Sequence, residues 1–507
     1  MNRVQSLKLG AIAQMLPIVA GYGSNFVATP FVVERLGLTN FGLWAVTGAI
    51  AQYGALLDLG VSRAIMRYVA LYHMQGDRQK ERAVVGGSVM IILSIGCVVS
   101  LFPLFIPAQL GNLIGEHNVA LARILFFAAI ILLVTGLLSQ MFTAASIGRG
   151  RTVAANIGLS IQRIAAVAGG VVALAVTPSL ETFAIGSAAG GAIGLVVLLL
   201  SILVDEREIR IGRPRREVFP DLIAFGLKGQ AMSLCEMVLF QSGKIIAGIV
   251  IGPAAAGAYE LGSRLALGAR AFGTATSGVL SAHLTRAYAS EGPDEIWRDY
   301  PRLVKRNAAV SNFALFFLVA TSFSIVPLWL GSNSSDVIAV LISLAVVYTI
   351  NVSAGVTTAA AFALNQLGTV MVGAVTIAVL AIGLAIPLAI VLGLPGILVG
   401  MVIAVTLGTL IAVVLIHRKS GIPLRALFAP IAGPFVVGTL STLLAAPIGI
   451  ILAPADRTSA VLPFLCSSAI FCALYMGLGW RFDYLPNLPR LRVRRAQSAK
   501  AVPGSDN

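Results

Sequence analysis

Charged side chains interrupt the apolar segment at 254–282. Glu260, Arg264 and Arg270 lie within it, although an ionised group at the centre of a bilayer costs roughly 3 kcal/mol or more. If a helix begins near Pro253, its rise places Arg264 about 17 Å and Arg270 about 26 Å along the axis, with all three charges on one broad face. Because arginine binds phosphate oxygens in a bidentate manner, this spacing predicts a face that holds an anionic head group. The alternative interpretation is that Glu260 and Arg264 form an ion pair that neutralises itself and leaves Arg270 unpaired.

The preceding apolar segment, 222–250, contains Lys228, Glu236 and Lys244. At this spacing the two lysines point about 160° apart on a helix. One of them can extend its amine to the membrane surface, while the other faces the interior and contributes to the head-group site. Cations outnumber acids among the intramembrane residues, which favours an anionic cargo over a cationic one. Glu236 and Glu260 are candidates for binding a coupling ion.

Further polar candidates lie in the first part of the chain. Arg63 and Arg67, one helical turn apart, either hold a phosphate at the cytoplasmic entrance or only anchor the chain at the membrane surface. Tyr22 and Asn25 suit the hydroxyl groups of a glycan, but such side chains equally suit helix packing. Arg163, ten residues into another apolar segment, has the same ambiguity as the lysines.

The composition is that of an integral membrane protein. Of the 507 residues, 58% are hydrophobic and only 11% are charged, whereas a soluble domain contains about 25% charged residues. The four cysteines lie in apolar runs without CxxC spacing, and the four histidines form no HExxH pair, so neither a metal nor another cofactor is expected. The net charge of +15 would suit nucleic acid only on a soluble surface, and no soluble domain is predicted.

Apolar runs of about 20 residues, each long enough to span a bilayer, recur along the chain. They predict an all-α polytopic membrane protein with about 14 transmembrane helices. The spans lie near 11–33, 40–60, 84–106, 121–145, 153–176, 182–204, 222–250, 254–282, 307–330, 337–363, 369–392, 395–416, 427–452 and 459–480. The N-terminal segment has no cleavage pattern, and we expect it to be retained as the first span.

Lysine and arginine are distributed asymmetrically. With a cytoplasmic N-terminus, most of the 36 basic residues fall in cytoplasmic segments, whereas Arg35, Arg123 and Arg457 lie on the outer side. This positive-inside pattern predicts that both termini are cytoplasmic. We expect the charges to meet anionic membrane lipids and not nucleic acid.

An internal repeat divides the chain. The sequences GLTNFGLW from Gly37 and GPAAAGAY from Gly252 share two glycines followed by an aromatic residue, and each opens a span at the same point of a six-span half. Such halves are parallel and related by an axis along the membrane normal. The predicted organisation is an N-terminal six-helix lobe (1–204), a cytoplasmic linker (205–221), a C-terminal six-helix lobe (222–420), an appended helix pair (421–480) and a basic cytoplasmic tail (481–507).

No pattern for catalysis is found. The outer loops are short and carry no paired carboxylates, and no glycine-rich loop ends in GK[ST]. A membrane-embedded synthase and a nucleotide hydrolase are therefore disfavoured. We expect a carrier, not an enzyme, that alternates access between two lobes.

Two stretches resemble a known family. They are VERLGLTNFGLWAVTGAIAQYGALLDLGVSRAIMRYVA (Val33 to Ala70) and LFQSGKIIAGIVIGPAAAGAYELGSRLA (Leu239 to Ala266). Both are similar to the polysaccharide transporter family of the multidrug/oligosaccharidyl-lipid/polysaccharide exporter superfamily, which includes the O-antigen flippases. That family often has an acidic residue where this sequence has Gly243, which argues against ion coupling at that position. The resemblance implies a central cavity, a bacterial inner membrane location, a polyprenyl-linked glycan as cargo, and a polysaccharide polymerase or glycosyltransferases as partners.

The leading hypothesis is a flippase that moves a polyprenyl-(pyro)phosphate-linked oligosaccharide to the outer leaflet for lipopolysaccharide or other surface polysaccharide biosynthesis. The second is a cation-coupled small-molecule or multidrug antiporter, in which Glu236 or Glu260 binds the coupling ion. A major-facilitator transporter is a third hypothesis, although its fourteen-span members insert the additional helix pair between the lobes and not at the end.

Overall fold

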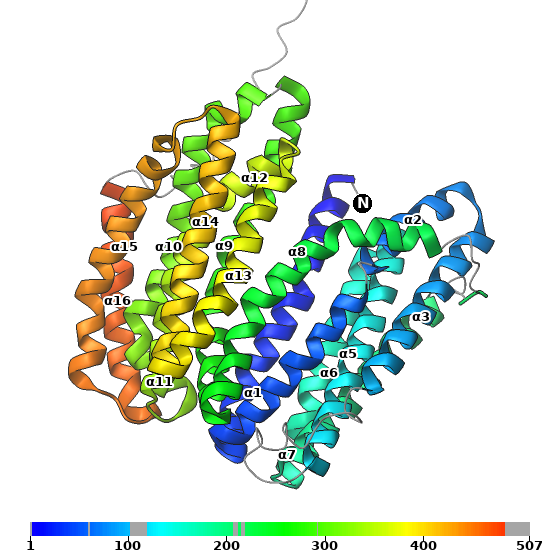
Figure 1. The fold of residues 1–507 in the computed structure, drawn as a ribbon, viewed down its shortest axis with the longest axis horizontal. Helices are drawn as coiled ribbons and strands as arrows, with labels where there is room; N and C mark the ends of the chain where they lie inside the picture. Colours follow the sequence, from blue (N-terminus) through cyan, green and yellow to red (C-terminus); the bar gives the residue numbers. More distant parts are fainter. Residues whose placement is uncertain are drawn as a thin grey trace, which may run out of the picture.

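The computed structural model of the chain describes residues 3–58, 61–101, 119–205, 211–213, 219–291 and 293–481. The regular structure within these ranges is helical, without strands. The helices in Figure 1 are α1 (Arg3–Tyr53), α2 (Val61–Gln75), α3 (Arg78–Leu101), α5 (Val119–Gly148), α6 (Thr152–Val176), α7 (Leu180–Asp205), α8 (Phe219–Ile246), α9 (Pro253–Glu291), α10 (Pro293–Leu330), α11 (Ser335–Ser353), α12 (Gly355–Ala363), α13 (Leu367–Leu392), α14 (Leu394–Ser420), α15 (Arg425–Leu452) and α16 (Arg457–Arg481). A 3-10 segment, η1 (Gly54–Asp58), follows α1, and a π-helical turn, η4 (Ala247–Ile251), follows α8.

Twelve helical segments in the described part are long and apolar enough to cross a membrane. The difference from fourteen predicted spans has two sources. The first is α1, whose 51 residues would extend about 76 Å as one straight helix, more than twice the bilayer core of about 30 Å. It is interrupted at Gly37 and therefore contains two of the predicted spans. The second is α9, which carries Glu260, Arg264 and Arg270 and is not among the twelve. The predicted all-α membrane fold is confirmed.

The helices form two lobes that lie close together at one end and diverge toward the other (Figure 1). The N-terminal lobe contains α1 to α3 and α5 to α7. The C-terminal lobe contains α9 to α14, with α15 and α16 packed against α10. Between them runs α8, whose Gln230 side chain donates a hydrogen bond to the carbonyl of Leu56 in η1. We refer to the end at which the lobes meet as the closed end. The opposite end, at which α1, α3, α6 and α8 begin, is referred to as the amino end.

The two glycine motifs of the internal repeat lie against each other at the closed end. Gly37 and Gly252 have φ values of +76° and +138°, which glycine adopts far more readily than other residues, and the chain turns at both. A Cβ atom on Gly42 would collide with the carbonyl group of Pro253, and one on Gly257 would press on the backbone of α1. The second glycine of each motif therefore lets the backbones of α1 and α9 touch.

The largest cluster of buried apolar side chains crosses this contact between the lobes. It includes Val32, Leu36 and Phe41 from α1 together with Leu261 and Leu265 from α9. Lipid tails are as apolar as these side chains, so close packing and not the exclusion of water stabilises the contact.

Parts of the predicted linker and tail, 206–210, 214–218 and 482–507, lie outside the described residues. Between the first two gaps, the Gly212 amide donates to the carbonyl of Arg82 near the start of α3, at 3.0 Å. The predicted domain boundaries stay predictions.

Candidate functional site

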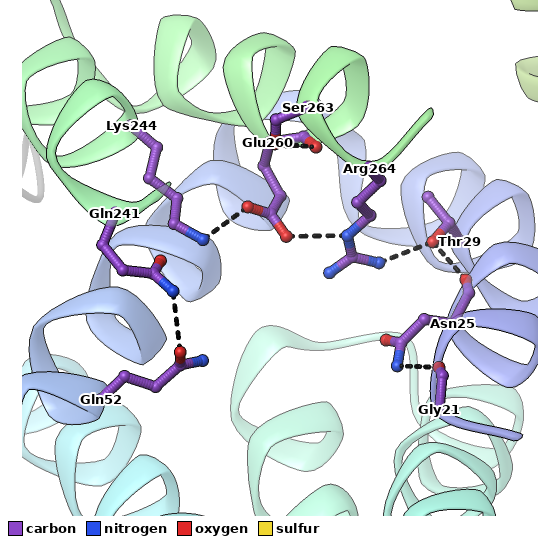
Figure 2. Close-up of polar contacts among 9 residues, drawn as sticks. All are labelled: Gly21, Asn25, Thr29, Gln52, Gln241, Lys244, Glu260, Ser263 and Arg264. Atoms are coloured by element: carbon purple, nitrogen blue, oxygen red, sulfur yellow. Dashed lines mark hydrogen bonds and ion pairs between the residues drawn. The ribbon is translucent and has the colours of Figure 1, made fainter. Parts of the chain in front are cut away.

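An ion cluster joins three of the predicted residues where α8 and α9 approach each other (Figure 2). The Lys244 amine lies 2.7 Å from one oxygen of Glu260, and Arg264 Nε lies 2.8 Å from the other. The turn at Gly252 produces this arrangement, because it folds α9 back along α8. The Glu260 side chain is only 12% exposed, and two cations share its one negative charge. The predicted pair of Glu260 with Arg264 is thus part of a triad that retains one positive charge.

Arg264 also reaches the N-terminal lobe. Its Nη1 donates to the Thr29 hydroxyl at 2.7 Å, and its guanidinium lies 5.1 Å from the centre of the Phe41 ring. Thr29 donates in turn to the carbonyl of Asn25 at 2.5 Å, and the Asn25 amide donates to the carbonyl of Gly21 at 2.8 Å (Figure 2). Arg264 therefore links the lobes. Its guanidinium already binds Glu260 and Thr29, so fewer of its N–H groups remain for a ligand than its position near mid-membrane suggested.

Arg270, further along α9, is held by aromatic rings and not by an acid. Its guanidinium lies 5.0 Å from the ring centre of Phe240 and 5.5 Å from that of Tyr348, and its Nη2 is 3.4 Å from Asn351 Oδ1. Its Nε is buried without a hydrogen-bond partner among the described residues. An unpaired buried donor is costly unless a ligand supplies the acceptor. The geometry thus leaves Arg270 more available to an anionic ligand than Arg264.

Two further contacts join α8 and α10 to α1 near the cluster. Gln241 Nε2 donates to Gln52 Oε1 at 2.8 Å, while Gln241 Oε1 is buried without a partner among the described residues (Figure 2). Trp329 Nε1 donates to the carbonyl of Phe26 at 2.9 Å, and their rings stack with centres 4.9 Å apart. These contacts are made from α8 and α10 to α1, and the Trp329 contact joins the two lobes directly.

Glu236 and Tyr22 lie near Arg270. Both side chains are exposed, and both are close enough to Arg270 to interact with it electrostatically. Glu236 forms no ion pair with a described residue, whereas Glu260 is bound to two cations. Of the two predicted ion-coupling carboxylates, only Glu236 is therefore accessible to a proton or metal ion without first breaking an ion pair.

The remaining predicted cations are not part of this cluster. Arg67 is exposed on α2 at the amino end, and its guanidinium lies 5.8 Å from the centre of the Tyr68 ring. The side chains of Arg63 and Lys228 lie outside the described part of the chain.

The residues that position the two arginines were not predicted from the sequence. Thr29 lies four residues after Asn25, so two polar side chains one turn apart on the same helix face were a usable signal. Phe240 and Tyr348 lie in apolar segments far apart in the sequence, and no local pattern distinguishes them from residues that face lipid.

The fold resembles solved transporters of the MOP superfamily. One is an inward-facing multidrug resistance transporter of the MATE family, with a TM-score of 0.66 and 15% identity over 80% of this chain and 94% of that one. Another is the lipid II flippase MurJ in an inward closed conformation, with a TM-score of 0.65 and 15% identity over 94% of this chain and 99% of that one. An outward-facing MATE transporter gives a TM-score of 0.55 and 18% identity over 82% and 95%. The chain therefore shares the fold of these transporters.

A match to a family model identifies the family of the chain. The model described as polysaccharide biosynthesis protein matches residues 7–279, which is more than half of the chain, and the chain belongs to that family. No curated protein sequence matches this chain. The matched region covers the N-terminal lobe and reaches α9, so it includes Lys244, Glu260, Arg264 and Arg270.

Proposed function

We propose that this protein is a flippase for a lipid-linked oligosaccharide. It moves a glycan carried on a polyprenyl phosphate or pyrophosphate from the cytoplasmic to the outer leaflet of a bacterial inner membrane, for surface polysaccharide biosynthesis. Membership of the polysaccharide biosynthesis family supports this function, as does the presence of a lipid II flippase among the structures of similar fold.

The observation that carries the proposal is unneutralised positive charge inside the membrane. Lys244 and Arg264 share one carboxylate, and Arg270 has aromatic neighbours and a buried, unpaired Nε among the described residues. Such charge is costly unless it faces water or an anion. A phosphate group supplies both the opposite charge and several strong acceptors. We therefore assign Arg270 the leading role in binding the head group and Arg264 and Lys244 supporting roles.

The arrangement of the lobes suits alternating access. The basic segments favour a cytoplasmic amino end, and the lobes diverge toward that end (Figure 1). A head group would then reach Arg270 from the cytoplasm while its polyprenyl chain stayed in the bilayer. Translocation would require the closed-end contacts to separate. In this orientation both termini, the linker and the tail meet the anionic inner leaflet, where partner glycosyltransferases act.

The test replaces Arg270 in the full-length protein reconstituted into liposomes. With a fluorescent oligosaccharide on polyprenyl diphosphate as cargo, Arg270→Gln should slow translocation about tenfold or more, because a hydrogen bond to a charged group contributes about 1.5–3 kcal/mol. Arg270→Lys should be intermediate, since it keeps the charge and loses the flat contact with the two rings.

Arg123→Gln is the matched control. Arg123 is an exposed arginine on α5, and its replacement should leave the rate unchanged. Translocation by Arg270→Gln at the wild-type rate would show that Arg270 has no role in the mechanism. A wild-type protein that moves no cargo would reject the proposed function.

A cation-coupled antiporter is the second candidate, and the exposed carboxylate of Glu236 beside Arg270 favours it. Glu236→Gln separates the two functions. Loss of ion-driven dye efflux from cells with complete surface polysaccharide would support the antiporter. Loss of surface polysaccharide with unchanged efflux would support the flippase.

A further inference from the structure

Two aromatic rings of the C-terminal half form walls around the guanidinium of Arg270. Its Cζ atom lies 5.0 Å from the centre of the Phe240 ring on α8 and 5.5 Å from the centre of the Tyr348 ring on α11. The two ring centres are 6.4 Å apart, and the ring planes are inclined by 60°. A cation within about 6 Å of a ring centre is attracted by the negative face of the ring. Phe240 and Tyr348 therefore form an aromatic cage for a cation, and Arg270 fills it.

The walls of the aromatic cage are held by residues other than Arg270. Tyr348 is 3% exposed and belongs to the largest apolar cluster, and Phe240 packs against the same cluster. Asn351, one turn after Tyr348 on α11, donates to the Thr409 hydroxyl of α14 at 3.2 Å. Because these contacts do not involve the arginine, we expect the cage to keep its shape when the Arg270 side chain is shortened.

A carboxylate lies beside the aromatic cage. Glu236 precedes Phe240 by four residues on α8, so the two side chains lie one turn apart on the same helix face. Glu236 is exposed, and none of the ion pairs between described residues includes it. Ring faces attract quaternary ammonium groups, and a nearby negative charge adds to that attraction. Without Arg270, the cage and Glu236 together suit a small organic cation.

The Arg270 side chain keeps such a cation out. It is covalently attached to α9, so a free cation competes with a group that is always present at the cage. Its charge also repels a second cation at contact distance. An anion is not excluded, because the N–H groups of a guanidinium point outward in its plane, and Arg270 Nε has no partner among the described residues.

We propose that Arg270 is a specificity-determining residue that excludes small organic cations from the aromatic cage of Phe240 and Tyr348. The cage without this side chain binds a quaternary ammonium or guanidinium group of similar size. This role goes beyond the proposed function and does not depend on the identity of the cargo. If the rings only pack against the apolar part of the arginine, its removal creates no site for a cation.

The experiment compares choline with its neutral isostere 3,3-dimethylbutan-1-ol. Each is titrated into the purified full-length protein, and binding is followed by calorimetry. Arg270→Ala should bind choline with a Kd on the order of 1 mM, as expected for a ligand of this size. It should bind the isostere at least about tenfold more weakly, because the rings and Glu236 attract only the charged molecule. The wild type and the control Arg123→Ala should bind neither.

Further variants test the walls of the aromatic cage. In the Arg270→Ala background, Tyr348→Leu should remove most of the choline binding, and Glu236→Gln should weaken it severalfold. If Arg270→Ala is not monodisperse, Arg270→Gln decides the matter, because its shorter side chain carries no charge to hold it between the rings.

Two results would overturn the proposal. Choline binding by the wild type as tight as that by the variant would show that Arg270 excludes nothing. Equal binding of choline and the isostere, or binding of neither, by the Arg270 variant would show that the rings form no cation site. Neither result bears on the translocation of a lipid-linked glycan, which is measured separately in liposomes.

Discussion

The hydrogen bond from Arg264 Nη1 to the Thr29 hydroxyl, 2.7 Å long, connects the charged cluster of the C-terminal lobe to α1 of the N-terminal lobe. Arg264 is bound to Glu260 at the same time. The cluster is therefore both a source of positive charge and a contact between the lobes, so a change in its charges is expected to alter the separation of the lobes as well as binding.

Removing the Thr29 hydroxyl should weaken the contact between the lobes. Thr29→Val keeps the shape of the side chain and leaves an Arg264 donor without its acceptor, at a cost of about 1–3 kcal/mol. We expect pulsed electron paramagnetic resonance, with one spin label in each lobe, to show a larger fraction of molecules separated at the closed end. Thr47→Val is the control, because the Thr47 hydroxyl donates to Leu43 of its own helix. The same distance distribution in both variants would contradict the role of Thr29.

Neutralising Glu260 should destabilise the protein. Glu260→Gln leaves the Lys244 and Arg264 charges without a counter-charge, and the loss of one partner of a buried ion pair costs about 3–5 kcal/mol. A clear fall in the thermal transition of the detergent-solubilised protein is expected. Lys244→Met should cost less, because the pair of Glu260 with Arg264 survives. Glu34→Gln, at an exposed position, should have no effect, and an equal effect of all three changes would refute the argument.

A side chain at Gly42 should force the closed end apart. Gly42→Val places a Cβ atom against the Pro253 carbonyl, whereas a Cβ atom on Gly48 in the same helix meets nothing within 4 Å. We expect a cysteine introduced at Leu38 to react several times faster with a water-soluble maleimide in the Gly42→Val background than in the Gly48→Val background. Equal rates would show that the glycine contact does not hold the lobes together.

The start of α16 should open in acid. The Asp456 carboxylate accepts hydrogen bonds from the hydroxyl of Ser459 at 2.6 Å and its N–H at 2.8 Å, which hold the pKa of Asp456 below its ordinary value of 3.8. A carboxyl group whose pKa is lower in the folded state than in the unfolded state stabilises the folded state at any pH above its pKa in the unfolded state. This stabilisation is lost as the pH falls through the pKa of the group in the folded state. Hydrogen exchange in the first turn of α16, corrected for intrinsic rates, should accelerate below about pH 4. In the Asp456→Ala variant, the amide protons of this turn should exchange fast at neutral pH already. Protection equal to that of the wild type would contradict this prediction.

Much of the fold follows from local sequence patterns. Apolar runs of bilayer length predict spanning helices because no other open structure satisfies the backbone in lipid. Helices begin at residues 152, 253, 335, 394 and 457, each within two residues of a predicted span. The repeat of Gly37 and Gly252 was visible because glycine alone tolerates the backbone of such turns.

The candidate site was only partly predictable. Arginine and glutamate in an apolar run are conspicuous because their burial is costly, so Arg264, Arg270 and Glu260 could be selected from the sequence. Their partners could not, since the rings of Phe240 and Tyr348 are as apolar as any residue facing lipid.

The sequence by itself determined the all-helical membrane fold, the parallel repeat and the excess of intramembrane cations, because periodicity, glycine turns and the cost of buried charge act locally. Only the tertiary structure decided how those cations differ. It pairs Lys244 and Arg264 with one carboxylate and ties Arg264 to Thr29, whereas Arg270 is held between two rings with a donor still unpaired. The physical reason is that hydrogen bonds and ion pairs are short-ranged, so the availability of a charge depends on neighbours that the fold brings from distant parts of the chain.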